Sequence, residues 1–88
     1  MAQIPTTAQH IVITERDGMF EFRHVEMKRH EMPLACMYRK GRKWIGDDMG
    51  MCEMGVGGKR AAHAFCMQVA CEKSDWLNLT WEDENYDD

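Results

Sequence analysis

Several features that would place the chain in a membrane or a secretory pathway are missing from its 88 residues. No apolar run approaches the roughly 18–20 residues that a membrane-spanning helix needs. Residues 1–9 contain neither the basic n-region nor the apolar h-region of a secretory signal. We therefore expect a cytoplasmic protein with no membrane partner.

Cysteine is present at four positions, Cys36, Cys52, Cys66 and Cys71, and an even count in a short chain is compatible with a disulfide framework. In a chain without a secretion signal we expect the cysteines to be reduced. Cys66 and Cys71 are five residues apart on a predicted helix and point to different faces, so they are poor partners for each other. Zinc binding by Cys52, His63, Cys66 and Cys71 stays open as an alternative, although the paired C-x2-C ligands of a zinc ribbon are missing. We assign no metal ligand and expect no cofactor.

Motifs for catalysis are also missing. The glycines before Lys59 lack the Walker spacing that cradles a nucleotide phosphate. A nucleophilic cysteine needs a neighbouring base, and no local motif supplies one. The four histidines are scattered along the chain. We therefore predict that the protein is not an enzyme.

Two strand-like runs flank an Asp-Gly pair near the N-terminus. Residues 11–14 are all β-branched, and residues 19–25 follow the pair Asp17-Gly18. Because both turn residues tolerate the positive φ of a type I′ turn, the two runs are predicted to form an antiparallel hairpin. Phe20 and Phe22 share one face of the second strand, and we expect them to face the core.

The middle of the chain predicts a second hairpin. Residues 34–38 read as a strand, residues 39–43 form a basic turn, and Trp44 begins a short fourth strand. Residues 47–58 hold four glycines and no apolar periodicity, so we expect a loop there.

The last third of the chain predicts one helix followed by one strand. An apolar stripe at the positions i, i+3, i+4 and i+7 indicates a helix over residues 61–73. The stripe consists of Ala62, Phe65, Cys66 and Val69. We expect the pair Ser74-Asp75 to end the helix. The alternation of Leu77, Leu79 and Trp81 predicts a final strand over residues 76–81.

The predicted order β-β-β-(β)-α-β is that of an α+β fold. It has a small antiparallel sheet of four or five strands and one helix packed on one face. At this length we expect a single domain over residues 10–81. A flexible lead-in over residues 1–9 and an acidic tail over residues 82–88 flank it.

Charge is divided between two parts of the chain. From Arg16 to Lys43, eight basic and four acidic residues give a local balance of +4; from Trp44 onward, three basic and ten acidic residues give −7. This polarity predicts two candidate partner-binding sets. The basic set is Arg39, Lys40, Arg42, Lys43 and Trp44, and the acidic set is Trp76, Trp81, Glu82, Asp83 and Glu84.

The two sets predict different partners. A row of carboxylates imitates phosphates and fits a basic groove on another protein, with tryptophans as anchors. A basic turn beside an aromatic residue grips phosphates, which keeps a small nucleic-acid-binding regulatory module open as an alternative. Because an acidic end repels phosphate, we favour a protein partner.

Residues 49–54 are rich in sulfur, and they hold Met49, Met51, Cys52 and Met54. Thioether and thiolate ligands in a loop suit a soft ion such as Cu(I), which stays open as a further alternative. Methionine side chains also adapt to irregular partner surfaces. We favour a methionine-rich contact surface.

The order of elements resembles that of small phage-encoded anti-CRISPR proteins that inhibit type I surveillance complexes. The likeness is carried by the strand at 11–14, the Asp17-Gly18 hairpin, the alanine-rich helix 61–70 and the closing strand 76–81. It is architectural, so no functional residue is carried over. It implies a non-catalytic inhibitor in the cytoplasm of a bacterial host. Such an inhibitor binds a CRISPR-Cas subunit or another host-defence protein, and blocks nucleic-acid access or nuclease recruitment.

Overall fold

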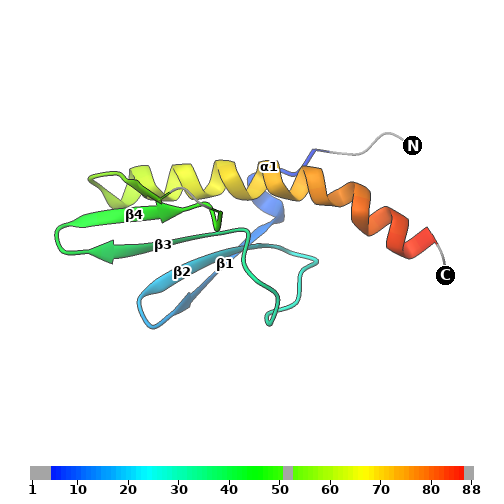
Figure 1. Ribbon diagram of the computed structural model, residues 1–88, viewed down its shortest axis with the longest axis horizontal. Coiled ribbons are helices and arrows are strands. Elements are labelled where there is room, and N and C mark those ends of the chain that lie inside the picture. The colour runs from blue at the N-terminus through cyan, green and yellow to red at the C-terminus, as the bar shows by residue number, and fades with distance from the viewer. Residues whose placement is uncertain (1–4, 51–52, 87–88) are drawn as a thin grey trace.

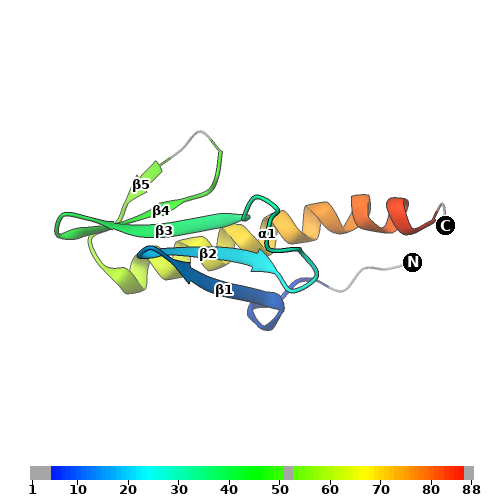
Figure 2. The ribbon, with the colours of Figure 1, turned by 90° about the horizontal axis from the view of Figure 1, so that it is seen from below.

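One long helix covers one face of a five-stranded antiparallel sheet, with the strands in the order β1-β2-β3-β4-β5 (Figures 1 and 2). The computed structural model describes residues 5–50 and 53–86, and it describes side chains over residues 5–50 and 56–77. The strands are β1 (Ile11–Arg16), β2 (Met19–His24), β3 (Ala35–Lys40), β4 (Lys43–Asp47) and β5 (Glu53–Gly55). A 3-10 turn (Ala8–His10) precedes β1, and α1 (Lys59–Tyr86) follows β5. The predicted α+β class, with one helix on one face of the sheet, is confirmed.

Two tight turns set the register of β1 against β2 and of β3 against β4. Asp17 and Gly18 have φ of 54° and 82°, as a type I′ turn requires, and Arg16 pairs with Met19 across it. The second turn joins Lys40 to its partner Lys43, and Gly41 adopts a φ of 66°. Both predicted hairpins are therefore confirmed.

The core lies between α1 and the sheet. Phe22, Ala35 and Met37 are buried on the strands. A row of small side chains, one every four residues along α1, is fully buried against them. This row is Ala62, Cys66, Ala70 and Ser74. Residues four apart lie on one face of a helix, so the row allows α1 to lie close to the strands. The predicted apolar stripe is confirmed, because its other two members, Phe65 and Val69, are partly buried against the same core.

The predicted final strand over residues 76–81 is wrong, because α1 runs without a break to Tyr86. Ser74, where we expected the helix to end, instead extends the buried row of small residues. No glycine or proline follows Lys73, so nothing in the sequence stops a helix that has already nucleated. The period-two alternation was too short to indicate a strand. One of the segments that carried the resemblance to anti-CRISPR proteins is therefore helical.

The expectation of a loop over residues 47–58 is wrong in part. β5 adds a short edge strand there, pairing Ile45 with Gly55 and Asp47 with Glu53. The backbone N–H of Val56 donates to the carbonyl of Trp44 at 3.0 Å, which continues the ladder toward α1. Backbone hydrogen bonds to an existing strand need no apolar periodicity, so the sequence carried no signal for β5.

The lead-in before β1 lies against α1. The backbone N–H of Thr6 donates to the carboxylate of Asp75, and Thr6 is buried. Residues 82–86 of the predicted acidic tail continue α1 as helical backbone.

α1 is much longer than the sheet that it covers. Its 28 residues extend about 42 Å at 1.5 Å per residue, whereas a six-residue strand extends about 20 Å. The C-terminal half of α1 therefore projects beyond the strands, and the molecule measures 48 × 24 × 24 Å (Figure 1). No helix in the described part of the chain is apolar enough over a sufficient length to cross a membrane.

Gly46 of β4 sets how closely α1 approaches the sheet, because a Cβ atom there would lie 2.6 Å from Cδ2 of Phe65. We predict that Gly46→Ala lowers the free energy of unfolding by about 1–3 kcal/mol through overpacking. Urea denaturation of the single variants and of the Gly46→Ala/Phe65→Ala double variant measures the effect. The loss should shrink in the Phe65→Ala background. An equal loss in both backgrounds would show that this contact is not its cause.

Candidate functional site

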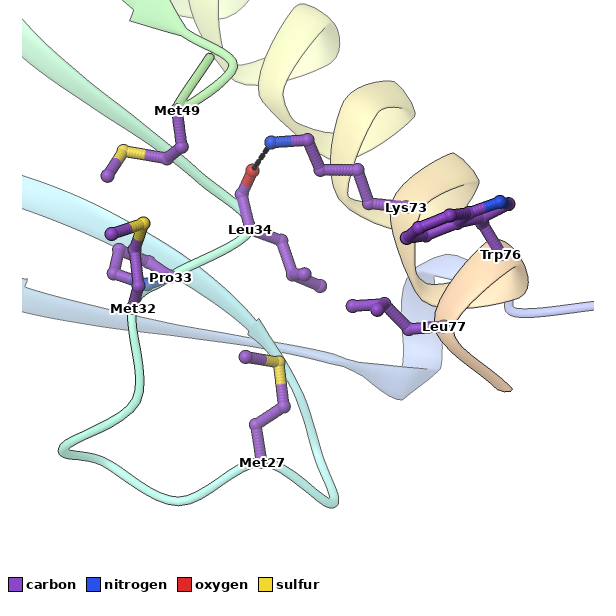
Figure 3. A pocket seen from close by; sticks show the side chains of 8 residues that line it. All are labelled: Met27, Met32, Pro33, Leu34, Met49, Lys73, Trp76 and Leu77. Atoms are coloured by element: carbon purple, nitrogen blue, oxygen red, sulfur yellow. Dashed lines mark hydrogen bonds between the residues drawn. The ribbon is translucent and has the colours of Figure 1, made fainter. Parts of the chain in front are cut away.

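An apolar cavity of about 310 Å³ opens where the C-terminal half of α1 leaves the sheet. Three separate segments supply its walls: the connection from β2 to β3, the turn after β4, and α1 (Figure 3). We call it the methionine pocket, and its lining residues are Met27, Met32, Pro33, Leu34, Met49, Lys73, Trp76 and Leu77.

Lys73 is hydrogen-bonded to both of the connecting segments that line this pocket. Its Nζ donates to the carbonyl of Leu34 at 3.0 Å and also to the carbonyl of Asp48. One ammonium on α1 therefore holds both connecting segments. The apolar stem of Lys73 lines the cavity while its charged head is hydrogen-bonded, an arrangement that long amphipathic side chains favour. Figure 3 shows Lys73 and Leu77 reaching from α1 toward Leu34.

The rim of the methionine pocket exposes large apolar side chains. Trp76 is 72% exposed and Met32 is 69% exposed. Single exposed apolar residues are ordinary, but an exposed patch that continues into an apolar cavity marks an interaction site. Tryptophan and methionine suit such a surface, because one offers a large rigid area and the other adapts its shape.

The structure separates the two predicted partner-binding sets. Trp76 lies at the methionine pocket, and residues 81–84 continue the same helix as backbone. The side chains of Trp81, Glu82, Asp83 and Glu84 lie outside the described residues. Arg39, Lys40, Arg42, Lys43 and Trp44 lie at the other end of the molecule, at the turn between β3 and β4 (Figure 1).

Sequence reasoning missed most of the pocket. Met27, Met32 and Leu34 come from a connection that shows no periodicity, and each lies far along the chain from α1. The available signal was the abundance of methionine, nine in 88 residues. We placed the methionine-rich surface at residues 49–54, of which Met49 does line the pocket. The side chains of Met51, Cys52 and Met54 lie outside the described residues.

At the basic turn, the fold adds residues from outside the predicted basic set. Nζ of Lys59, the first residue of α1, lies 5.0 Å from the ring centroid of Phe20 and 5.3 Å from that of Trp44. The two rings are 5.9 Å apart. A helix start and two strands are thus joined by cation–π contacts beside the turn.

A polar cavity of about 300 Å³ lies between β1, β2 and Arg29. The buried guanidinium of Arg23 fills one side of it. That group donates to Glu21 Oε1 at 3.0 Å, to the carbonyl of Glu31 at 3.0 Å and to Thr14 Oγ1 at 3.5 Å. These bonds satisfy much of a charge that burial would otherwise destabilise, so we interpret the cluster as support for the connection from β2 to β3.

The buried cysteines are poor nucleophiles and poor ligands. Burial, with a smaller effect from Asp47, raises the pKa of Cys36 to about 11, and burial likewise raises the pKa of Cys66 to about 11. At neutral pH both are protonated thiols, whereas nucleophilic attack and metal binding need the thiolate. Cys36 Sγ contacts Met49 Sδ at 3.5 Å, and Cys66 Sγ donates to the carbonyl of Cys36 at 3.2 Å.

The candidate zinc ligands that the structure describes are not gathered into one site. Cys66 is buried in the core, and the exposed His63 packs edge-on against Phe22 at 5.4 Å. Cys52 lies outside the described residues. Within residues 5–50 and 56–77, no three His, Cys, Asp or Glu side chains are close enough to share an ion. Cys36, Cys66 and Cys71 are free cysteines.

Comparison with known proteins adds no relative: no family model, curated protein or solved structure matches the chain.

We predict that, at about pH 8, iodoacetamide labels Cys36 and Cys66 only as fast as the protein unfolds. Peptide mapping by mass spectrometry resolves each site, with the partly exposed Cys71 as the internal comparison. Since folding raises both thiol pKa values from 9.0 to about 11, stability should fall as the pH rises through that window. Labelling of Cys36 and Cys66 as fast as in a short peptide would contradict this prediction.

Proposed function

We propose that the protein is a non-catalytic inhibitor that binds a partner protein through the methionine pocket and Trp76. The observation that carries this proposal is the apolar cavity of about 310 Å³ with Trp76 and Met32 exposed at its rim. Tryptophans that sit beside a pocket are the usual anchors of protein interfaces. The lining holds one charged side chain, Lys73, whose ammonium is already hydrogen-bonded to two carbonyls. An apolar segment of a protein therefore suits it better than a polar small molecule.

The charge around the pocket indicates the chemistry of the partner. We call the part of α1 from Glu72 onward the acidic end, because it holds the carboxylates of Glu72, Asp75, Glu82, Asp83 and Glu84 and only one cation, Lys73. Its shape is a narrow rod that projects beyond the sheet. A rod with negative charge complements a positively charged groove, so the partner is a protein with such a groove beside an apolar residue.

Positively charged grooves of this kind belong to proteins that hold nucleic acid. Occupation of the groove by the acidic end would exclude the phosphate backbone and so inhibit the partner. The resemblance to small anti-CRISPR proteins names a partner class with this property, a CRISPR-Cas effector subunit or another host-defence protein in a bacterial cytoplasm. No cofactor takes part in inhibition by occlusion.

Trp76→Ala tests the contact surface. We expect it to weaken binding to a purified type I CRISPR effector complex by about 30-fold or more, as loss of an interface anchor does. Biolayer interferometry measures the affinity, and circular dichroism checks the helix content. The matched control is Val12→Ala on β1, another exposed apolar residue, which should bind like the wild type.

Two results would count against this proposal in different ways. If the wild-type protein does not bind the effector complex, the partner class is wrong. If Trp76→Ala and Val12→Ala bind equally well, the partner class stands and the contact surface is wrong.

Charge reversal tests the role of the acidic end. The triple variant Glu82→Lys/Asp83→Lys/Glu84→Lys should weaken inhibition at least tenfold, with the larger part of the loss in the association rate. Reversal of Arg39, Lys40, Arg42 and Lys43 to glutamate should leave inhibition unchanged. Inhibition that survives the first variant and is lost in the second would contradict the assignment to the acidic end.

A further inference from the structure

We propose that the opposite end of the molecule binds the phosphate backbone of a nucleic acid. The fold gathers six exposed cations there, which we call the basic end: Arg39, Lys40, Arg42, Lys43, Lys59 and Arg60. The first four belong to the turn between β3 and β4, and the last two begin α1. This site is separate from the methionine pocket and does not depend on it.

Strand pairing brings the two groups of cations together, although Lys43 and Lys59 are separated by the whole of β4 and β5. Val56, three residues before Lys59, is hydrogen-bonded to the carbonyl of Trp44. Lys59 then reaches over the ring of Trp44, whose strand partner is Arg39. Figures 1 and 2 show the start of α1 beside the β3–β4 end of the sheet. The cations therefore cluster around one end of the sheet, with Arg39 and Lys59 on the side that α1 covers and Lys40 and Lys43 on the other side.

These cations have no acidic partners close by in the described part of the chain. The ion pair found there is that between Arg23 and Glu21, away from this surface. The first turn of α1 contains no acidic residue. The unpaired N–H groups at that helix start add a partial positive charge of their own. Among the side chains that the structure describes, the basic end therefore presents positive charge with no acidic partner.

The turn also places two like charges opposite each other, and this pair does not stabilise the isolated domain. Lys40 and Lys43 are direct partners across the ladder, and like charges in this position destabilise a hairpin. Arg42 lies between them in the turn. A bound polyanion would turn this repulsion into attraction to a shared phosphate. This arrangement suits a surface that binds phosphates.

The aromatic residues define how the nucleic acid is recognised. Phe20 and Trp44 are partly buried, and Lys59 already lies over both rings. They fix the position of Lys59, which already occupies a face of each ring. Recognition through phosphates alone reads no base sequence, so binding should depend strongly on salt and little on sequence.

The acidic end does not prevent this binding. Glu82 follows Lys59 by 23 residues, which is about 35 Å along α1. At physiological salt the Debye length is about 8 Å, so the distance is about four screening lengths. The net charge of −4 therefore says little about the potential at the basic end.

Fluorescence anisotropy with a labelled single-stranded DNA of about 20 nucleotides tests the proposal, with RNA and duplex DNA as parallel probes. We expect binding at about 20 mM salt that weakens as salt rises. The variant Lys40→Gln/Lys43→Gln should bind at least tenfold more weakly, and its log–log salt slope should be smaller by about 1.4, or 0.7 for each lost contact to a single strand. The same variant should unfold at an equal or higher urea concentration, because the like-charge pair is gone.

The matched control is Lys28→Gln/Arg29→Gln, which removes the same charge from the exposed connection between β2 and β3. It should bind within about twofold of the wild type. No anisotropy change with any of the three probes at low salt would overturn the proposal. So would an equal loss in both double variants, which would indicate a net-charge effect. Equal affinity for labelled poly-glutamate would show instead that the basic end takes an acidic polypeptide.

Discussion

The close contact between α1 and the sheet is the interaction on which the rest of the molecule depends. It exists because Ala62, Cys66, Ala70 and Ser74 are small and lie on one line of the helix, opposite Gly46 and its neighbours. Larger side chains on that line would lift the helix and separate it from Phe22 and Met37. In a domain this small, one such face provides most of the buried apolar surface. The contact also fixes the direction in which the projecting half of α1 points.

Both candidate surfaces follow from that contact. The methionine pocket forms where α1 passes the last strand residue and leaves apolar side chains without a sheet to cover them. The basic end forms where α1 begins, because the same helix starts beside the turn between β3 and β4. One helix thus places an apolar, acidic region and a basic region at opposite ends. The charge division seen in the sequence becomes a division in space.

Features with a local cause could be predicted from the sequence. The Asp17-Gly18 turn needs only its own two residues to adopt positive φ, so the first hairpin was correct. The start of the buried stripe on α1 was also correct, since it is a property of neighbouring turns. The C-terminal strand was wrong because the alternation of Leu77, Leu79 and Trp81 satisfies a strand pattern by chance. The helix continues past residue 73 because no stop signal follows, and the burial of Ser74 in the core is visible only in the tertiary packing.

The candidate sites show the same difference between features with a local cause and features that depend on tertiary packing. The cations of the turn between β3 and β4 are adjacent in the sequence and could be recognised there. Lys59 joins them only because β5 pairs with β4. The methionine pocket draws on three segments, and no single segment predicts it. Trp76 was predicted as an interface anchor because it lies beside the carboxylates of the C-terminal end, although it belongs to a helix and not to the predicted strand.

A single continuous helix connecting the two surfaces links their spacing to their orientation. Each residue of an α-helix advances 1.5 Å and turns by about 100°. An insertion of one residue between Ala70 and Lys73 would therefore move the pocket only slightly, yet it would rotate Trp76 and Lys73 away from the two connections that they meet. Length changes in this stretch are tolerable only near whole numbers of turns. The helix therefore fixes both the distance and the relative rotation of the two surfaces.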